Sequence, residues 1–306
     1  MKHRYVYLVI FLLALAPWWM DSRYIYHVAT MIGIMIPLAL SMNLMLQLGQ
    51  LSLAHPAFMG LGAYGAALLT MRLGFPPLLA MFCGGLVSAF FALVFGPIFL
   101  RIKGVYFVLL TYAFGSIVNL IFQEWTGLFG GNSGIYGIPK FSILGLRLTQ
   151  VWQYYIFSLI FALIVYIVIR SVERSNIGSI YQALNENEPM CLSIGSNALS
   201  WRVAAFVFSA MIAGMSGAIY AFYIGFLSPD PFGLQLSIDL IVMTAVGGSQ
   251  SMLGPLIGAI IIVPLPELLR DAREYQLMIY GFCLIVFLLF IKKGIVSLID
   301  RQRAAA

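Results

Sequence analysis

Residues 77–100 read PLLAMFCGGLVSAFFALVFGPIFL, a stretch without one charged side chain. The rest of the chain has the same character, since 62% of its 306 residues are hydrophobic and 9% are charged. An α-helix needs roughly 20 apolar residues to cross the hydrocarbon core of a bilayer. Only helices and closed β-barrels satisfy their backbone groups there, and barrel strands are about ten residues of alternating polarity. The sequence therefore predicts an all-α fold, a polytopic transmembrane helical bundle.

Cutting the apolar runs at glycine, proline and charged residues predicts about 8–10 membrane segments. The candidates are 5–20, 24–47, 53–71, 77–100, 105–123, 151–170, 202–224, 234–249, 252–269 and 275–291. Breakers and polar groups concentrate near 49–57, which predicts a broken or re-entrant segment there. No polar stretch is long enough to bury a separate core, so we expect one membrane domain over residues 1–306.

The basic residues predict the orientation of the bundle. The first apolar run resembles a secretory signal, but Pro17 follows its cleavage-like box Ala14-Leu15-Ala16, so we expect a retained first helix. With both termini cytoplasmic, most of the 17 lysines and arginines lie inside, as the positive-inside rule requires. The net charge of +6 then reflects cytoplasmic loops and tails, and nucleic-acid binding is not expected.

This orientation leaves one long external loop and one long cytoplasmic loop. The external loop, 124–150, contains GGNSGIYGIP at 130–139, whose glycines permit positive φ at several turns and therefore a tight lid. Its candidate gating residues are Gly130, Gly131, Asn132, Gly134 and Gly137. The cytoplasmic loop, 171–201, is the only sizeable loop predicted on the inner side.

A short helix of about 188–194 is predicted within the cytoplasmic loop. Asn187 is suited to the N-cap, Glu188 and Pro189 to the first turn, and Gly195 to the stop. One side of this helix is apolar, and two acids border it; the residues concerned are Met190, Cys191, Ile194, Glu186 and Glu188. Two interpretations are open: the apolar side packs on its own bundle, or it docks a soluble partner.

Motifs for covalent chemistry are missing from the sequence. There is no GxxxxGK[ST] phosphate loop, so ATP hydrolysis by that route is excluded for this chain. The three histidines show no HExxH spacing and the three cysteines no CxxC spacing, so neither a metal site nor a redox pair is predicted. We expect a protein that is not an enzyme.

Polar groups within apolar surroundings are the candidates for a transport path. The segment around the breakers supplies Gln47, Gln50, Ser52 and His55. His55 has two open interpretations, a substrate contact or a neutral side chain bonded to a neighbouring helix. The acids Asp239, Glu124 and Glu267 lie near predicted outer ends rather than the midplane, which disfavours the alternative of an ion-coupled secondary transporter.

The pattern Gly49-x-x-Ser52-x-x-x-Pro56 recurs as Gly248-x-x-Ser251-x-x-x-Pro255. Each copy follows one apolar segment and precedes another. Transporters often consist of two related halves with the path near their interface. The echo therefore suggests an internal repeat, although glycine, serine and proline are common in such turns.

Four stretches occur in an order and at spacings that match one protein family. They are LGQLSLAHPAFMGLGAY at 48–64, GGNSGIYGIP at 130–139, the inner-loop end Ile194-Gly195, and DLIVMTAVGGSQSMLG at 239–254. The chain resembles the permeases of high-affinity branched-chain amino-acid ABC importers, and in particular the longer of their two permease subunits. Two departures stand out: Met190-Cys191-Leu192 replaces two alanines and a glutamate, and Pro56 replaces a small residue.

The resemblance implies a permease in the bacterial inner membrane that shares a path for branched-chain or related neutral amino acids with a second permease subunit. It also implies two ATPase subunits that bind ATP and Mg²⁺, no cofactor in this chain, and a periplasmic binding protein that docks on the external loop. The coupling helix to the ATPase subunits is then formed by Glu186, Glu188, Pro189, Met190, Cys191, Ile194 and Gly195. Relatives on the same scaffold carry urea, short amides or other amino acids, so these substrates stay open.

Overall fold

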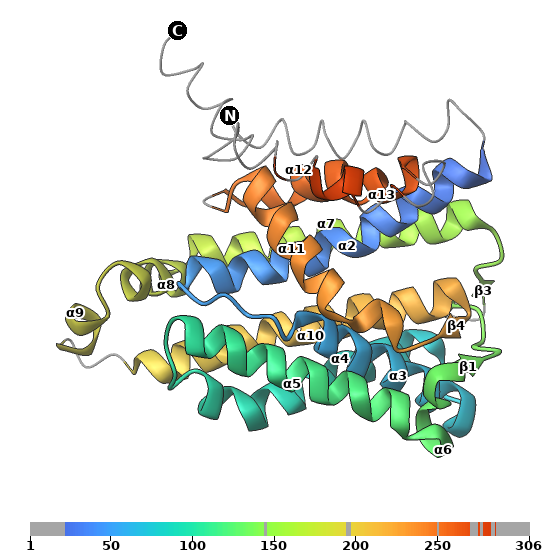
Figure 1. Ribbon diagram of the computed structural model, residues 1–306, viewed down its shortest axis with the longest axis horizontal. Coiled ribbons are helices and arrows are strands. Elements are labelled where there is room, and N and C mark those ends of the chain that lie inside the picture. The colour runs from blue at the N-terminus through green and yellow to red at the C-terminus, as the bar shows by residue number, and fades with distance from the viewer. Residues whose placement is uncertain are drawn as a thin grey trace, which may run out of the picture. The chain divides into compact units, whose positions relative to one another are not determined.

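The computed structural model describes residues 22–143, 146–193, 197–249 and 251–269, together with 275, 278–282 and 285. These residues are mostly helical (Figure 1). The α-helices are α2 (Arg23–Gln47), α3 (His55–Leu73), α4 (Pro77–Phe99), α5 (Val105–Glu124), α6 (Thr126–Phe129), α7 (Val151–Arg174), α8 (Asn176–Glu186), α9 (Glu188–Ser193), α10 (Ala198–Ile224), α11 (Leu234–Gly247), α12 (Leu253–Ile262) and α13 (Pro264–Leu268). The short elements are η1 (Gly131–Ser133), η2 (Asp230–Phe232), β1 (Ile135–Tyr136), β2 (Ser142–Ile143), β3 (Leu146–Arg147) and β4 (Phe226–Leu227).

Five of these helices, α2, α4, α5, α7 and α10, are long and apolar enough to cross a membrane. Each coincides with a predicted segment, and α4, α5 and α7 begin at the predicted residue. Helix α3 also coincides with a predicted segment but is less hydropathic, because glycines and Arg72 interrupt its apolar residues. The prediction of an all-α polytopic membrane protein is confirmed.

The C-terminal third differs from the predicted segments. Helix α11 has 14 residues, which is short for a full crossing at roughly 20 residues. The predicted segment 252–269 is not one helix, because α12 ends at Ile262 and α13 begins at Pro264. Proline has no N–H to donate and its ring clashes with the preceding turn, which explains the interruption. The predicted segment 5–20 lies outside the described residues, and only a few residues of 275–291 are described.

The chain forms two compact units. One comprises residues 1–40, 149–166 and 239–306, and the other comprises 41–148 and 167–238. We call them the terminal unit and the central unit. The chain passes from one to the other within α2, α7 and α11, and also between β3 and α7. The description of residues 1–306 as a single permease domain remains a prediction.

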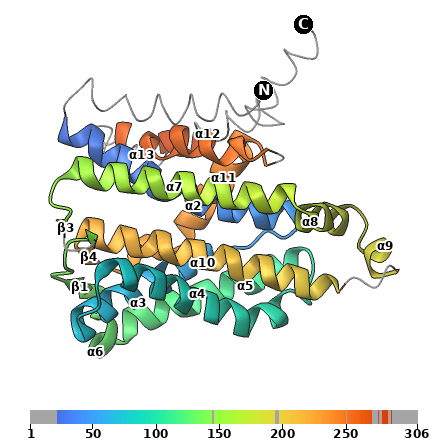
Figure 2. The same cartoon turned by 180° about the vertical axis from the view of Figure 1, so that it is seen from behind.

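The central unit is built on α3, α4 and α10, which lie side by side (Figure 2). Their contact surfaces are lined by small residues, so the backbones approach closely. A Cβ atom at Gly62 would overlap the backbone of Gly214, and one at Gly217 would overlap the backbone of Met59. Small residues of this kind allow tight helix packing within a bilayer, where water provides no hydrophobic driving force. Aromatic side chains then fill the space around the three helices, as where Phe58 packs against Phe114 and Phe206.

In the terminal unit, glycine residues also allow helices to pack closely. A Cβ atom at Gly33 of α2 would overlap Ser158 of α7, and one at Gly258 of α12 would overlap the backbone of Met243 of α11. The Tyr280 hydroxyl donates to Asp239 Oδ1 at 2.7 Å. This bond gives the Asp239 carboxyl a polar partner within an apolar part of the chain.

The two copies of the Gly-Ser-Pro pattern form similar turns. Gly49 and Gly248 both have positive φ, at 72° and 111°. In each turn the serine side chain accepts from the backbone N–H two residues later, at 3.3 Å in both copies. In each copy the proline lies in the first turn of the next helix, α3 or α12. The repeated sequence pattern therefore corresponds to a repeated local structure.

Candidate functional site

The breaker segment between α2 and α3 is non-helical from Leu48 to Ala54, and α3 begins at His55. Side chains from two helices satisfy the peptide groups of Leu53. Its N–H donates to Thr111 Oγ1 of α5 at 3.1 Å, and its carbonyl accepts from Ser237 Oγ of α11 at 3.0 Å. Unpaired backbone groups within a bilayer are costly, so these two bonds explain how irregular backbone persists among apolar helices.

His55 forms a buried polar link among three helices. Its Nε2 lies 2.8 Å from Ser209 Oγ of α10, and Ser209 Oγ lies 2.8 Å from the Ser41 carbonyl of α2. Ser209 has one hydroxyl proton, and a carbonyl can only accept it, so His55 Nε2 must be the donor to Ser209. Nε2 of the histidine therefore carries a proton, and Nδ1 is buried without a hydrogen-bond partner in the described structure. This geometry supports the interpretation of His55 as a structural link.

The other residues predicted to line a path, Gln47, Gln50 and Ser52, differ in their burial and in their hydrogen bonds. Gln47 is half-buried and donates from Nε2 to Glu173 Oε1 at 3.1 Å. Gln50 and Ser52 are buried, and the Ser52 side chain caps its own turn. These four residues therefore do not line a common open surface. Their role in a path remains a prediction, since the fold uses at least Ser52 and His55 to hold its own backbone.

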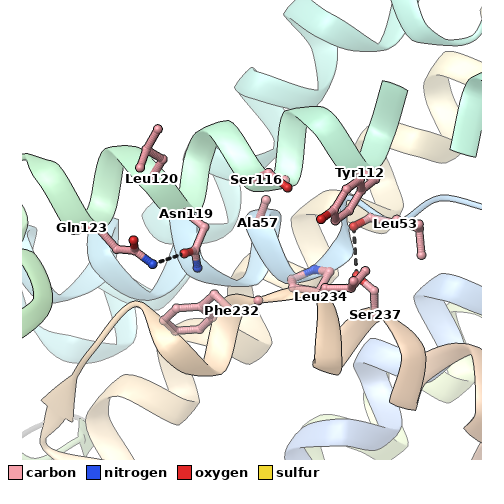
Figure 3. Close-up of a pocket in the computed structure, with 13 residues that line it drawn as sticks. Leu53, Ala57, Tyr112, Ser116, Asn119, Leu120, Gln123, Phe232, Leu234 and Ser237 are labelled. Carbon is pink, nitrogen blue, oxygen red and sulfur yellow. Dashed lines mark hydrogen bonds between the residues drawn. The ribbon is translucent and has the colours of Figure 1, made fainter. Parts of the chain in front are cut away.

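A hollow of about 200 Å³ lies next to the breaker segment, within the central unit (Figure 3). Its walls come from the start of α3, one face of α5, and the η2–α11 connection; they are Leu53, Pro56, Ala57, Tyr112, Gly115, Ser116, Asn119, Leu120, Gln123, Phe232, Gly233, Leu234 and Ser237. Asn119 and Gln123 extend from α5 toward Phe232 (Figure 3). The hollow is mostly apolar, with the polar groups concentrated along α5.

Hydrogen bonds fix the polar side of this hollow. Gln123 Nε2 donates to Asn119 Oδ1 at 2.7 Å, and Asn119 Nδ2 donates to the Pro229 carbonyl at 2.8 Å. The sequence prediction missed these residues because it searched for ionisable groups and for polar groups beside the breakers. The available signal was the spacing of Tyr112, Ser116, Asn119 and Gln123, which is four, three and four residues and therefore one helix face.

The loop predicted to be cytoplasmic, 171–201, contains two helices rather than one. Helix α9 confirms the predicted start at Glu188, whereas α8 was not predicted. Ser175 caps α8 by accepting from the Ile177 N–H at 3.2 Å, and Tyr181 and Leu184 are buried on one side of the helix. The apolar spacing of α8 was the missed signal.

Glu188 is the centre of an ion-pair cluster at the start of α9. Its carboxylate accepts from both terminal nitrogens of Arg202, at 3.0 and 3.1 Å, and from Lys103 Nζ. The Lys103 ammonium and the Arg202 guanidinium lower the pKa of Glu188. The Arg202 side chain is 7% exposed, whereas that of Lys103 is 61% exposed. The cluster therefore ties α9 to the start of α10 and to the loop that precedes α5.

The remaining residues of the predicted coupling helix fall into two groups. Glu186 and Pro189 are exposed, whereas Cys191 is buried within its own chain. The Met190 side chain, Ile194 and Gly195 lie outside the described residues. Cys191 and Glu188 thus make contacts that favour packing on the bundle, and docking of a partner on this helix remains a prediction.

The loop predicted to be external, 124–150, has the compact backbone that its glycines predict. Gly130, Gly131, Gly134 and Gly137 all have positive φ, between 60° and 77°. Strand β1 of this loop pairs antiparallel with β4, which follows α10, and the Tyr136 ring packs on Phe226. Asn132 is exposed. The described part of this loop is therefore compact, with Asn132 exposed; its role as a gate or docking surface remains a prediction.

These features define a class, a multi-pass helical membrane protein in which one long helix carries a polar face beside a hollow. The chain belongs to the family described as the branched-chain amino acid transport system/permease component, which matches residues 24–288. This family comprises permeases of ABC transporters, which are not enzymes themselves.

Two relatives are similar over most of their length. The high-affinity branched-chain amino acid transport system permease protein LivM of Salmonella typhimurium is 29% identical, over 98% of this chain and 76% of the relative. LivM of Escherichia coli K12 is 28% identical over the same shares. No solved structure matches the chain.

Proposed function

We propose that this chain is one of two permease subunits of an importer for branched-chain or related neutral amino acids. In this proposal two ATPase subunits bind ATP and Mg²⁺ and supply the energy, and a periplasmic binding protein delivers the substrate. The complex lies in the bacterial inner membrane, with both termini of this chain in the cytoplasm. The family and the names of both relatives support this assignment.

The observation that carries the proposal is the polar face of α5. This helix is long and apolar enough to span a membrane, yet only 28% of its most apolar stretch is buried in this chain. On the polar face, Tyr112 and Ser116 are exposed, and Asn119 and Gln123 are half-buried. Polar side chains are costly against lipid, so such a face requires a protein partner or an aqueous path. A permease that shares its path with a second subunit provides both.

The α8–α9 region is the proposed site of coupling to ATP hydrolysis. Glu188 fixes the start of α9 to Arg202, which is in the first turns of the long helix α10. A displacement of α9 by a bound ATPase subunit would therefore be passed directly to α10. Because α10 packs on α3 and α4, this displacement reaches the core of the central unit.

Copurification and reconstitution test the proposal. The tagged chain should retain a second polytopic subunit and ATPase subunits after detergent extraction. Proteoliposomes of this complex should take up leucine only with ATP inside and loaded binding protein outside. Uptake by the chain alone, driven by a proton or sodium gradient, would contradict the proposal and favour an ion-coupled carrier.

A further inference from the structure

The exposed part of α5 carries a polar stripe in an otherwise apolar surface. Tyr112 and Ser116 are exposed, Asn119 and Gln123 are half-buried, and all four lie on one helix face. The neighbouring exposed side chains on α5 are apolar, as Leu109, Ile117, Leu120 and Ile121 show. A helix that meets lipid all round would not keep such a stripe.

The hollow beside this stripe has the size and polarity of a small-molecule site. Its volume of about 200 Å³ is below the roughly 300–1,000 Å³ of sites for drug-sized ligands, so it suits a molecule as small as one amino acid. Among the residues that the structure describes, no Asp, Glu, Lys, Arg or His lines it. An ion with a net charge would therefore lack a charged partner there. An amino acid is a zwitterion without net charge, so its ammonium and carboxylate partly offset each other and need hydrogen bonds from the polar lining rather than a charged partner.

The lining divides into an apolar and a polar part. Pro56, Ala57, Leu120 and Phe232 offer an apolar wall, and Ser116, Asn119 and Gln123 offer hydroxyl and amide groups. The Ser116 hydroxyl has no hydrogen-bond partner within the described ranges, and Asn119 is held in place by Gln123 and Pro229. Polar groups fixed before a ligand arrives lose little conformational entropy on binding.

We infer that this hollow is a transient binding site for the transported molecule, a neutral amino acid with an aliphatic side chain. The side chain lies on the apolar wall and the polar end faces α5. The inference rests on the proposed function and adds to it a location for the transported molecule in this chain. Because the hollow is open on one side, the second permease subunit completes it. Binding is weak without an ionic partner in this chain, which suits a path that must release its cargo.

Gly115 provides a direct test because it lies on the floor of the hollow. A Cβ atom there would meet only the Leu53 carbonyl oxygen, at 3.5 Å, which is an ordinary contact. Gly115→Ala therefore fits, and Gly115→Leu fills the hollow. Ala113→Leu is the matched control, since Ala113 is exposed on α5 but does not line the hollow.

The full complex is reconstituted with its binding protein, and uptake of leucine and valine is measured. Gly115→Leu should lower leucine uptake at least about tenfold, since even one misplaced methylene in a pocket changes discrimination by about that factor. Gly115→Ala should lower leucine uptake more than valine uptake. Ala113→Leu should transport both like the wild type, and all variants should retain their partner subunits.

Wild-type uptake of both amino acids by Gly115→Leu, or an unchanged leucine-to-valine ratio in Gly115→Ala, would overturn the inference while leaving the proposed function intact. Loss of the second permease from Gly115→Leu together with that unchanged ratio would show the hollow to be a packing surface. A wild-type complex that carries neither amino acid would instead refute the proposed function, and this inference with it.

Discussion

The link His55–Ser209–Ser41 and the polar face of α5 contain similar kinds of side chain but meet opposite surroundings. In the link, His55 and Ser209 are each 1% exposed, and their bonds end within the chain. On α5, Ser116 is exposed and Asn119 and Gln123 are half-buried beside a hollow. The comparison teaches that a polar residue in a membrane helix indicates a path only when its surroundings are open. When they are closed, the same residue holds helices together.

The largest expected effect follows from breaking the buried link. Ser209→Ala leaves the buried His55 N–H without its hydrogen-bond partner and removes one bond to the Ser41 carbonyl, and an unsatisfied buried group costs about 1–3 kcal/mol. We expect a loss of about 3 kcal/mol in the free energy of unfolding. Unfolding of the detergent-solubilised complex by heat or by sodium dodecyl sulfate measures it.

Ser216→Ala is the matched control, because Ser216 is equally buried on α10 and donates only to the carbonyl of Ile212 one turn earlier. Its loss should stay below about 1 kcal/mol. Equal unfolding midpoints for the two variants would contradict the role of the link. In the double variant His55→Leu/Ser209→Ala, part of the lost stability should return, since one orphaned group is removed.

In burial, the Glu188 cluster is intermediate between the His55–Ser209–Ser41 link and the polar face of α5. Its Arg202 is buried, while Glu188 is partly exposed. Glu188→Gln leaves the Arg202 guanidinium without its carboxylate, and we expect α9 to be destabilised by about 2 kcal/mol. Hydrogen exchange in α9 and proteolysis of the loop measure this. Glu186→Gln, an exposed acid two residues away, should change the stability by at most about 1 kcal/mol. Equal exchange in the two variants would show that the cluster does not fix α9.

The pH dependence of α9 follows from the lowered pKa of Glu188, whose first cause is Lys103 and second Arg202. A carboxyl whose folded pKa is lowered stabilises the fold fully above its unfolded pKa of about 4.3 and loses this contribution as the pH falls through the folded value. Protection of α9 should therefore be constant between about pH 5 and pH 8 and decrease below about pH 4. A change between pH 6 and pH 8 would assign the dependence to another group.

The smallest expected effect on stability comes from a substitution on the polar face of α5. Asn119→Ala removes one bond to the Pro229 carbonyl beside an accessible hollow, so the free energy of unfolding should change by about 1 kcal/mol or less. The same variant should nevertheless reduce substrate uptake. A loss of stability as large as that of Ser209→Ala, with unchanged uptake, would remove the distinction between the two regions.

The sequence predicts the membrane helices well because the length of an apolar run is a local property. Helices α4 and α5 match their predicted ranges to within one residue at each end. The break between α12 and α13 was missed although Pro264 marks it, because hydropathy alone does not register a lost N–H donor. The pairing of β1 with β4 joins residues about 90 positions apart, and no local pattern specifies it.

The candidate site was predicted less well, for a physical reason. Polarity and breakers drew the prediction to Gln50, Ser52 and His55, whose side chains the fold buries. Which face of α5 is covered depends on the packing of α3 and α4, and this is a tertiary property. The hydrogen bonds of Thr111 and Ser237 to Leu53 also depend on tertiary packing, since nothing near Leu53 in the sequence identifies these partners.

The bond between Leu53 and Ser237 also has a consequence for how the chain is made. Its two residues are 184 positions apart, so at about 5–20 residues per second the ribosome finishes the second roughly 10–40 s after the first. During that interval the Leu53 carbonyl lacks its final partner. Completion of the breaker segment is therefore a late event in biogenesis, because its last hydrogen bond needs α11.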